Sequence, residues 1–141
     1  MHNKLILLLI AILLTSPVIL AKKLERFKPY RLVADTENSF DVAVEETRNK
    51  LSSSKLTLVG EYSPYDGAHI FALTHDILLK SAAEADFGGY GAVIRLAATK
   101  TDETVQVAYV NPVYMTNLYH IPEVPELEQL LEQTLGESTP F

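Results

Sequence analysis

The stretch Tyr62-Ser63-Pro64-Tyr65-Asp66-Gly67-Ala68-His69 decides the fold of this chain. It separates two apolar, β-prone segments, residues 55–62 and 68–74. Proline and the Asp66-Gly67 pair form turns, and a short turn between two such segments joins antiparallel strands. The stretch therefore predicts a β-hairpin with residues 63–67 as its connection. The second strand is apolar on both faces, which is typical of an inner strand of a sheet.

The elements on either side of the hairpin follow from hydrophobic periodicity, caps and turn residues. Strands are predicted at 30–35, 55–62, 68–74, 92–100 and 104–110, and helices at 40–51, 76–85 and 125–135. Ser39 is expected to cap the first helix and Thr74 the second, and Gly136 to end the last. The run from Pro112 to His120 stays open between a helical turn and coil.

The element order is therefore β-α-β-β-α-β-β-α. Two hairpins with helices between them predict an α+β fold, a two-layer sandwich in which a mostly antiparallel sheet carries its helices on one face. Residues 87–91 hold three glycines but precede a strand, so they are expected to form a tight connection and not a phosphate-binding loop.

The N-terminus has the pattern of a secretory signal peptide, residues 1–21, with a basic Lys4 before an apolar run that a Ser-Pro pair breaks. An uncleaved membrane anchor is the alternative, although the run is short for a bilayer span. Export to the periplasm or the medium, with no anchor after cleavage, is the expectation. Residues 22–29 would form an N-terminal arm and residues 30–136 one domain. For residues 137–141, a frayed tail and a truncated gene product are both open interpretations.

Composition excludes several classes of function. The chain has 141 residues and no cysteine, which rules out disulfides, zinc–thiolate sites and thiol catalysis. With 12 basic and 18 acidic residues it carries a net charge of −6, whereas a protein that binds duplex nucleic acid needs a cationic surface. No nucleic-acid partner and no cofactor are therefore predicted.

The leading functional hypothesis is a non-enzymatic domain that binds a small ligand or a partner protein in a tyrosine-lined cleft. Tyrosine combines a large apolar ring with a polar hydroxyl, which suits pockets and interfaces. The predicted cleft residues are Tyr62, Tyr65, Asp66, His69, Tyr90, Arg95, Asn111 and Tyr114. The alternative is that these tyrosines belong to the core and only their hydroxyls reach the surface.

Two further hypotheses concern catalysis and metal binding. A small hydrolase or isomerase would use Asp66 and His69 as an acid–base pair, although Ser63 lacks the sequence context of a nucleophile elbow. A metal site would draw on five candidate ligands at spacings that form no known metal-binding motif. These candidates are Asp66, His69, His75, Asp76 and His120.

Three blocks, Y-S-P-Y-D-G-A-H (62–69), F-G-G-Y-G-A (87–92) and N-P-V-Y-M (111–115), resemble an uncharacterised group of exported bacterial proteins. That group is similar to the larger family known as domain of unknown function 302 (DUF302). The resemblance covers roughly residues 39–135 and implies a small α+β fold, an envelope location and no assigned activity. Relatives continue beyond a T-P-F segment, whereas this chain ends at Phe141.

Overall fold

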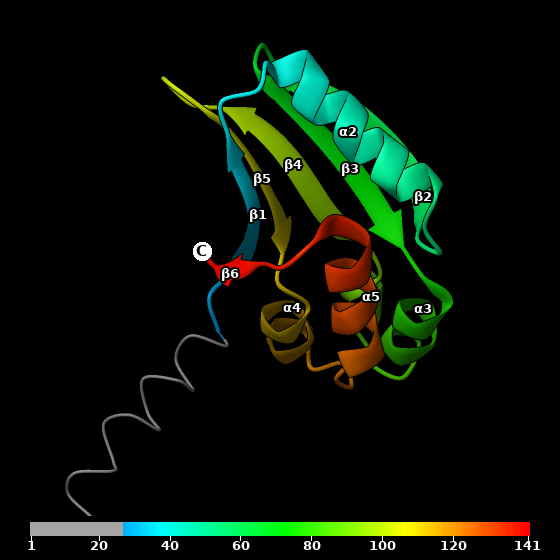
Figure 1. Cartoon of the computed structure of the whole chain (residues 1–141). Helices are drawn as coiled ribbons and strands as arrows, with labels where there is room; N and C mark the ends of the chain where they lie inside the picture. Colours follow the sequence, from blue (N-terminus) through cyan, green and yellow to red (C-terminus); the bar gives the residue numbers. More distant parts are fainter. Residues whose placement is uncertain (1–26) are drawn as a thin grey trace, which may run out of the picture.

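A computed structural model describes residues 27–141, and the predicted signal peptide and residues 22–26 of the predicted arm lie outside these residues. The described chain forms one antiparallel sheet of strand order β2-β3-β4-β5-β1-β6, with helices packed around it (Figure 1). In chain order the elements are β1 (Tyr30–Thr36), α2 (Phe40–Ser52), β2 (Thr57–Tyr65), β3 (Ala68–Thr74), α3 (Asp76–Ala82), the 3-10 helix η1 (Gly88–Gly91), β4 (Ile94–Lys100), β5 (Val105–Val110), α4 (Pro112–Tyr119), α5 (Pro125–Leu135) and β6 (Thr139–Pro140).

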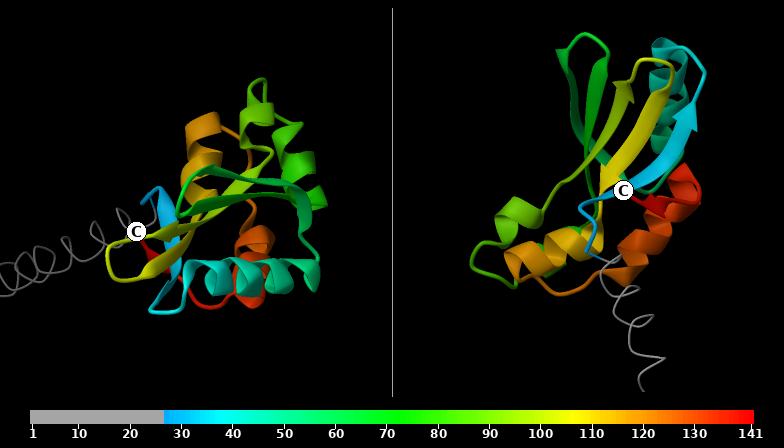
Figure 2. Two further views of the ribbon diagram at one scale, coloured as in Figure 1. Left: turned by 90° about the horizontal axis from the view of Figure 1, so that it is seen from above. Right: turned by 90° about the vertical axis from the view of Figure 1, so that its left-hand side faces the viewer.

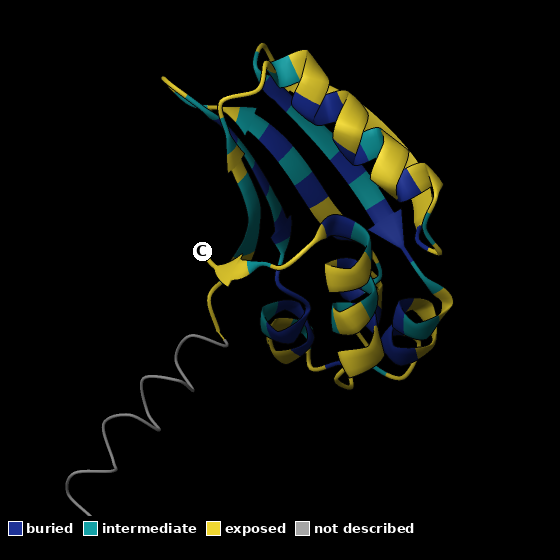
Figure 3. Cartoon of the chain, viewed as in Figure 1, coloured by how far each residue is buried: buried dark blue, intermediate teal, exposed yellow. Residues whose placement is uncertain are grey.

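The core lies between the sheet and the helices on one of its faces. Phe71, Leu96 and Tyr109 sit side by side on β3, β4 and β5, and each is at most 2% exposed. Successive residues of a strand point to opposite faces, so buried and less buried positions alternate along β4 (Figure 3). One face of the sheet is therefore the core face. We call the other the open face.

Helix α2 covers the core face as its sequence pattern predicts. Ser39 is the N-cap, with its side-chain oxygen accepting a hydrogen bond from the Val42 N–H. The buried positions Val44, Thr47 and Leu51 form one stripe along the helix. α5 continues this layer and contacts α2, and Gly136 follows its last turn.

The hairpin turn is shorter than predicted. β2 runs on to Tyr65, so the turn itself is only Asp66-Gly67, with Gly67 at a φ of +79°. Such a two-residue turn needs positive φ, which glycine supplies without strain. The β2–β3 register shifts between Tyr62 and Tyr65, which makes an irregularity of the β-bulge kind around Ser63.

The cap of α3 also differs from the prediction. Thr74 is still part of β3, and its hydroxyl donates a hydrogen bond to the Ala92 carbonyl. The N-cap is His75, whose Nδ1 accepts from the Ile77 N–H. The helix then ends at Ala82, three residues earlier than expected.

Two segments that the sequence left open are ordered. The run after Pro112 forms α4, capped by the Asn111 side chain and ended by His120 at a φ of +55°. At the C-terminus, β6 pairs with β1, and the Phe141 and Tyr30 backbones exchange two hydrogen bonds. The last residues are therefore docked against the sheet.

The arrangement is the two-layer α+β sandwich that was predicted, with additional elements at one end. Seen from above in Figure 2, α2 and α5 lie on one side of the sheet, and α4, η1 and α3 lie towards the other. The open face of the sheet is thus bordered by α4 and η1. Within residues 27–141, no helix has the length and apolar character needed to cross a bilayer.

Candidate ligand-binding cleft

Small apolar side chains create a hollow on the open face of the sheet. Ile70, Ala97 and Ala108 are neighbours across β3, β4 and β5, and Val110 lies further along β5 opposite Tyr30. The hollow has a volume of about 290 Å³. Its lining consists of Tyr30, Ile70, Arg95, Ala97, Thr99, Ala108, Val110 and Phe141.

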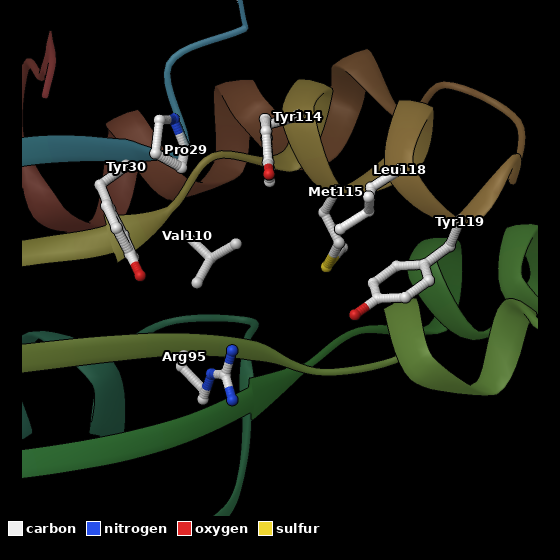
Figure 4. A pocket seen from close by; sticks show the side chains of 8 residues that line it. All are labelled: Pro29, Tyr30, Arg95, Val110, Tyr114, Met115, Leu118 and Tyr119. Carbon is white, nitrogen blue, oxygen red and sulfur yellow. The ribbon is translucent and has the colours of Figure 1, made fainter.

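A second, smaller hollow of about 90 Å³ lies beside α4 (Figure 4). Its lining consists of Pro29, Tyr30, Arg95, Val110, Tyr114, Met115, Leu118 and Tyr119. The two hollows share Tyr30, Arg95 and Val110, so they adjoin on one face of the sheet. We call the two adjoining hollows together the open-face cleft.

Helix α4 supplies the end wall of the open-face cleft. Tyr114 and Leu118 are four residues apart and lie on one side of the helix, while Met115, 3% exposed, anchors the helix in the core. The ring of Tyr119 stacks on that of Tyr90 in η1, with centroids 6.0 Å apart. This contact joins η1 to the wall.

Gly91 permits the close approach of η1 to α4. A Cβ atom at this position would lie 2.9 Å from the Ile121 side chain and 3.3 Å from the Tyr119 ring. A side chain at this position would require the end of the Ile121 side chain and the Tyr119 ring to shift. The glycine-rich block therefore serves the packing of this wall, in agreement with the tight connection expected from sequence.

Arg95 is the charged group of the open-face cleft. It is exposed on β4, and in Figure 4 its guanidinium extends into the space between Tyr30, Val110 and Tyr119. Within the part of the chain that the structure describes, Arg95 makes no hydrogen bond or ion pair. A guanidinium offers five donors in a planar fork that matches carboxylates and phosphates. An unpaired cation beside apolar side chains and tyrosine rings favours the binding of a ligand that has both an anionic group and an apolar part.

The structure divides the eight predicted cleft residues into separate groups. Arg95 and Tyr114 line the open-face cleft, and Tyr90 adjoins it through Tyr119. Tyr62 lies opposite Ile70 on the same face of the sheet but outside the lining of either hollow.

The other predicted residues lie elsewhere. Tyr65 and Asp66 are exposed at the hairpin tip, and Tyr65 is 64% exposed. Asn111 is 3% exposed and structural, since its Oδ1 accepts from the Val113 N–H and its Nδ2 donates to the Lys28 carbonyl. These positions do not meet at one end of the sheet.

His69 lies on the opposite face from the open-face cleft, beside Phe71 and under α2. Its Nε2 is 3.0 Å from Glu61 Oε2, and its Nδ1 is 3.0 Å from Ser63 Oγ. The carboxylate partner is Glu61 and not Asp66, because Asp66 occupies the turn whereas Glu61 pairs with Phe71 on the same face as His69. The predicted Asp66–His69 pair is not formed.

Arg48 of α2 fixes the Glu61 carboxylate. Its Nη2 lies 3.0 Å from Glu61 Oε2, it also pairs with Glu45, and its guanidinium lies over the Phe71 ring. The hydrogen bond from Arg48 lowers the pKa of Glu61, and the one from His69 lowers it further. Glu61 is therefore ionised at neutral pH.

The metal hypothesis gains no support from the side-chain positions. Among residues 27–141, no three histidine or acidic side chains gather closely enough to hold a metal ion. His75 is occupied as the cap of α3, and His120 ends α4 on another part of the surface.

Sequence reasoning missed Tyr30, Phe141 and Glu61. Tyr30 and Phe141 meet because β6 pairs with β1, a contact between residues far apart in the sequence. Glu61 could not be found by counting residues. Counting back from the Asp66-Gly67 turn places Pro64 and Tyr62 on the His69 face, and only the register shift between Tyr62 and Tyr65 brings Glu61 opposite Phe71 on that face.

Comparisons with known proteins bear on the fold. No protein-family model matches the chain, and no curated protein matches its sequence. Among solved structures, the chain is similar to one described as "Crystal structure of uncharacterized conserved protein DUF302 from Bacillus stearothermophilus". The TM-score is 0.57 at 12% sequence identity, over 75% of this chain and 91% of that chain. The DUF302-like fold expected from the three sequence blocks is thus confirmed.

Proposed function

We propose that this chain is an exported domain that binds a small amphipathic anion in the open-face cleft. The carboxylate or phosphate of the ligand pairs with Arg95, and its apolar part lies over Ala97, Ala108 and Val110. Tyr30 and Tyr114 flank the ligand and offer hydroxyl groups. Of the two occupants considered from the sequence, a small ligand and a partner protein, we propose the small ligand.

The observation that carries the proposal is the unpaired guanidinium of Arg95 in a groove of apolar and tyrosine side chains. Organic ligands generally occupy hollows of about 300–1,000 Å³. The larger hollow, about 290 Å³, lies at the lower end of this range and so suits a small ligand. The net charge of −6 repels anions at long range, so recognition depends on this local cation.

The test compares two probes of the same length, octanoate and 1-octanol, by isothermal titration calorimetry on the wild-type protein. A hydrogen bond to a charged group contributes about 1.5–3 kcal/mol, so octanoate should bind about tenfold or more tightly than the alcohol. Arg95→Gln should remove this difference while the alcohol affinity stays the same. Lys80→Gln, which removes an exposed cation on α3, is the matched control and should leave the affinities for octanoate and 1-octanol unchanged.

The proposal fails if octanoate binds wild type and Arg95→Gln equally, or if neither probe binds. Export is tested separately by N-terminal sequencing of the protein from the envelope or medium. A mature N-terminus at Lys22 is expected, and a retained Met1 in the membrane fraction would contradict it.

A further inference from the structure

A second chemical cluster lies on the other face of the sheet, at the edge strand β2. Ser63 Oγ is 3.0 Å from His69 Nδ1, and His69 Nε2 is 3.0 Å from Glu61 Oε2. A hydroxyl, an imidazole and a carboxylate thus form one continuous chain of hydrogen bonds. This is the arrangement of a nucleophile, its base and a group that orients the base.

The carboxylate determines where the imidazole carries its proton. Glu61 is ionised and can only accept hydrogen bonds, so the Nε2 of His69 must donate. In the neutral imidazole Nδ1 then has the lone pair and accepts the hydrogen bond from the Ser63 hydroxyl. The tautomer is therefore the one that allows His69 to remove a proton from Ser63.

The surroundings hold these groups in place. Arg48 binds the Glu61 carboxylate through Nε and Nη2, and the ring of Phe71, which is fully buried, meets the His69 ring edge-on at 4.7 Å between centroids. The side chain of His69 is only 13% exposed, whereas Ser63 is exposed. The base is thus fixed and the hydroxyl faces solvent.

We propose that Ser63 is an acyl-accepting nucleophile toward small esters, with His69 as its general base and Glu61 as the positioning residue. The Ser63 oxygen attacks the ester carbonyl carbon while its proton moves to His69 Nδ1. The carbon–oxygen bond to the leaving alcohol then breaks, and the alcohol takes that proton. Water, deprotonated by His69, cleaves the acyl–Ser63 ester, and the Ser63 oxygen regains a proton from His69. The net reaction is hydrolysis of the ester to an acid and an alcohol.

The position of Ser63 on the fold suits this chemistry. β2 is an edge strand, so no neighbouring strand in the described chain uses the backbone N–H groups along its outer side. Such groups can donate to the oxyanion that develops on the carbonyl oxygen. The register shift between Tyr62 and Tyr65 lies at Ser63, and bulges of this kind redirect side chains beside active sites.

The test uses a fluorophosphonate probe on the protein purified after expression of the full chain. Ser63 would displace fluoride and form a phosphorus–oxygen bond, giving one adduct that peptide mapping locates. Labelling at Ser63 is expected in wild type, at least tenfold slower labelling in His69→Gln, and none in Ser63→Ala. Ser52→Ala, which removes another exposed hydroxyl, should label like wild type.

Turnover of 4-nitrophenyl acetate shows whether Glu61 positions His69 for catalysis or only stabilises the fold. Glu61→Gln should lower kcat about tenfold with little change in KM, and Glu61→Asp should restore part of the loss. The proposal is overturned if the probe does not modify Ser63, or if labelling is unchanged in His69→Gln. Since Ser63 and Arg95 lie on opposite faces, octanoate binding and Ser63 labelling can fail independently.

Discussion

At the scale of single residues, the ion pair and hydrogen bonds around Glu61 connect α2 to the edge of the sheet. The Glu61 carboxylate accepts hydrogen bonds from Arg48 of α2 and from His69 of β3. The Glu61 side chain is 34% exposed. An ion pair that is this exposed to solvent is worth about 0.2–1 kcal/mol, because water and salt screen it. Glu61 therefore makes a small but pH-dependent contribution to stability.

Glu61→Gln should lower the free energy of unfolding at pH 7 by about 0.5–1 kcal/mol. Because the pKa of Glu61 is lower in the folded protein than in the unfolded chain, its contribution is fully present above the unfolded pKa of about 4.3. It is lost as the pH falls through the folded-state pKa. Urea unfolding of both proteins at pH 7, 5 and 3 measures the difference.

The matched control is Glu37→Gln, which removes an exposed glutamate with no hydrogen bond or ion pair among residues 27–141. It should leave stability unchanged within about 0.5 kcal/mol. A Glu61→Gln effect that stays constant down to pH 3 would show that the carboxylate charge is not the source of the stabilisation.

Much of the residue-scale detail depends on register, which the sequence defines only in part. The Asp-Gly turn was predictable, and so were the Ser39 cap and the alternation along β4. The partner of His69 was not predicted correctly, because proximity in sequence favoured Asp66 over Glu61. A regular two-residue period counted from the turn would leave Glu61 on the opposite face, and the register shift between Tyr62 and Tyr65 moves it to the face of His69.

At the scale of secondary-structure elements, α4 decides whether the open-face cleft has an end wall. Its first turn depends on Asn111, whose side chain caps the helix and also donates to the Lys28 carbonyl. One buried side chain thus holds the helix start to the chain that enters β1.

Asn111→Ala should lower the free energy of unfolding by about 1–3 kcal/mol, because it removes a cap and leaves a partly buried carbonyl without its donor. Ser39→Ala, the loss of an exposed cap on α2, is the control and should cost no more than about 1 kcal/mol. Urea unfolding of both variants tests the ranking. Equal costs would contradict the structural role assigned to Asn111.

The helices that were predicted well carry strong amphipathic stripes, as α2 and α5 do. α4 was left open because its eight residues are too few for a clear period, and because Pro112 is compatible with both a turn and a helix start. β6 could not be predicted at all, since two residues form a strand only where β1 offers a free edge. These are the elements that complete the cleft, so the site was less predictable than the fold.

At the scale of the whole molecule, the sheet separates two surfaces with different chemistry. One face is covered by α2 and bears the Ser63–His69–Glu61 cluster at its edge, and the other is the open-face cleft with Arg95. The fold class and the antiparallel hairpins followed from the sequence. The division of the predicted site residues between the two faces required the strand order β2-β3-β4-β5-β1-β6.

Methyl chemical-shift mapping by NMR during titration with octanoate tests the central claim most directly. Adjacent residues provide internal controls, because Ala97 and Ala108 face the cleft whereas Ala98 and Val107 face the core. We predict saturable shifts for Ala97, Ala108 and Val110 that require about tenfold or more octanoate to saturate in Arg95→Gln, with Ala98 and Val107 little changed. Shifts centred on the core-face methyls, or no saturable shift at the open face, would contradict a ligand site in the open-face cleft.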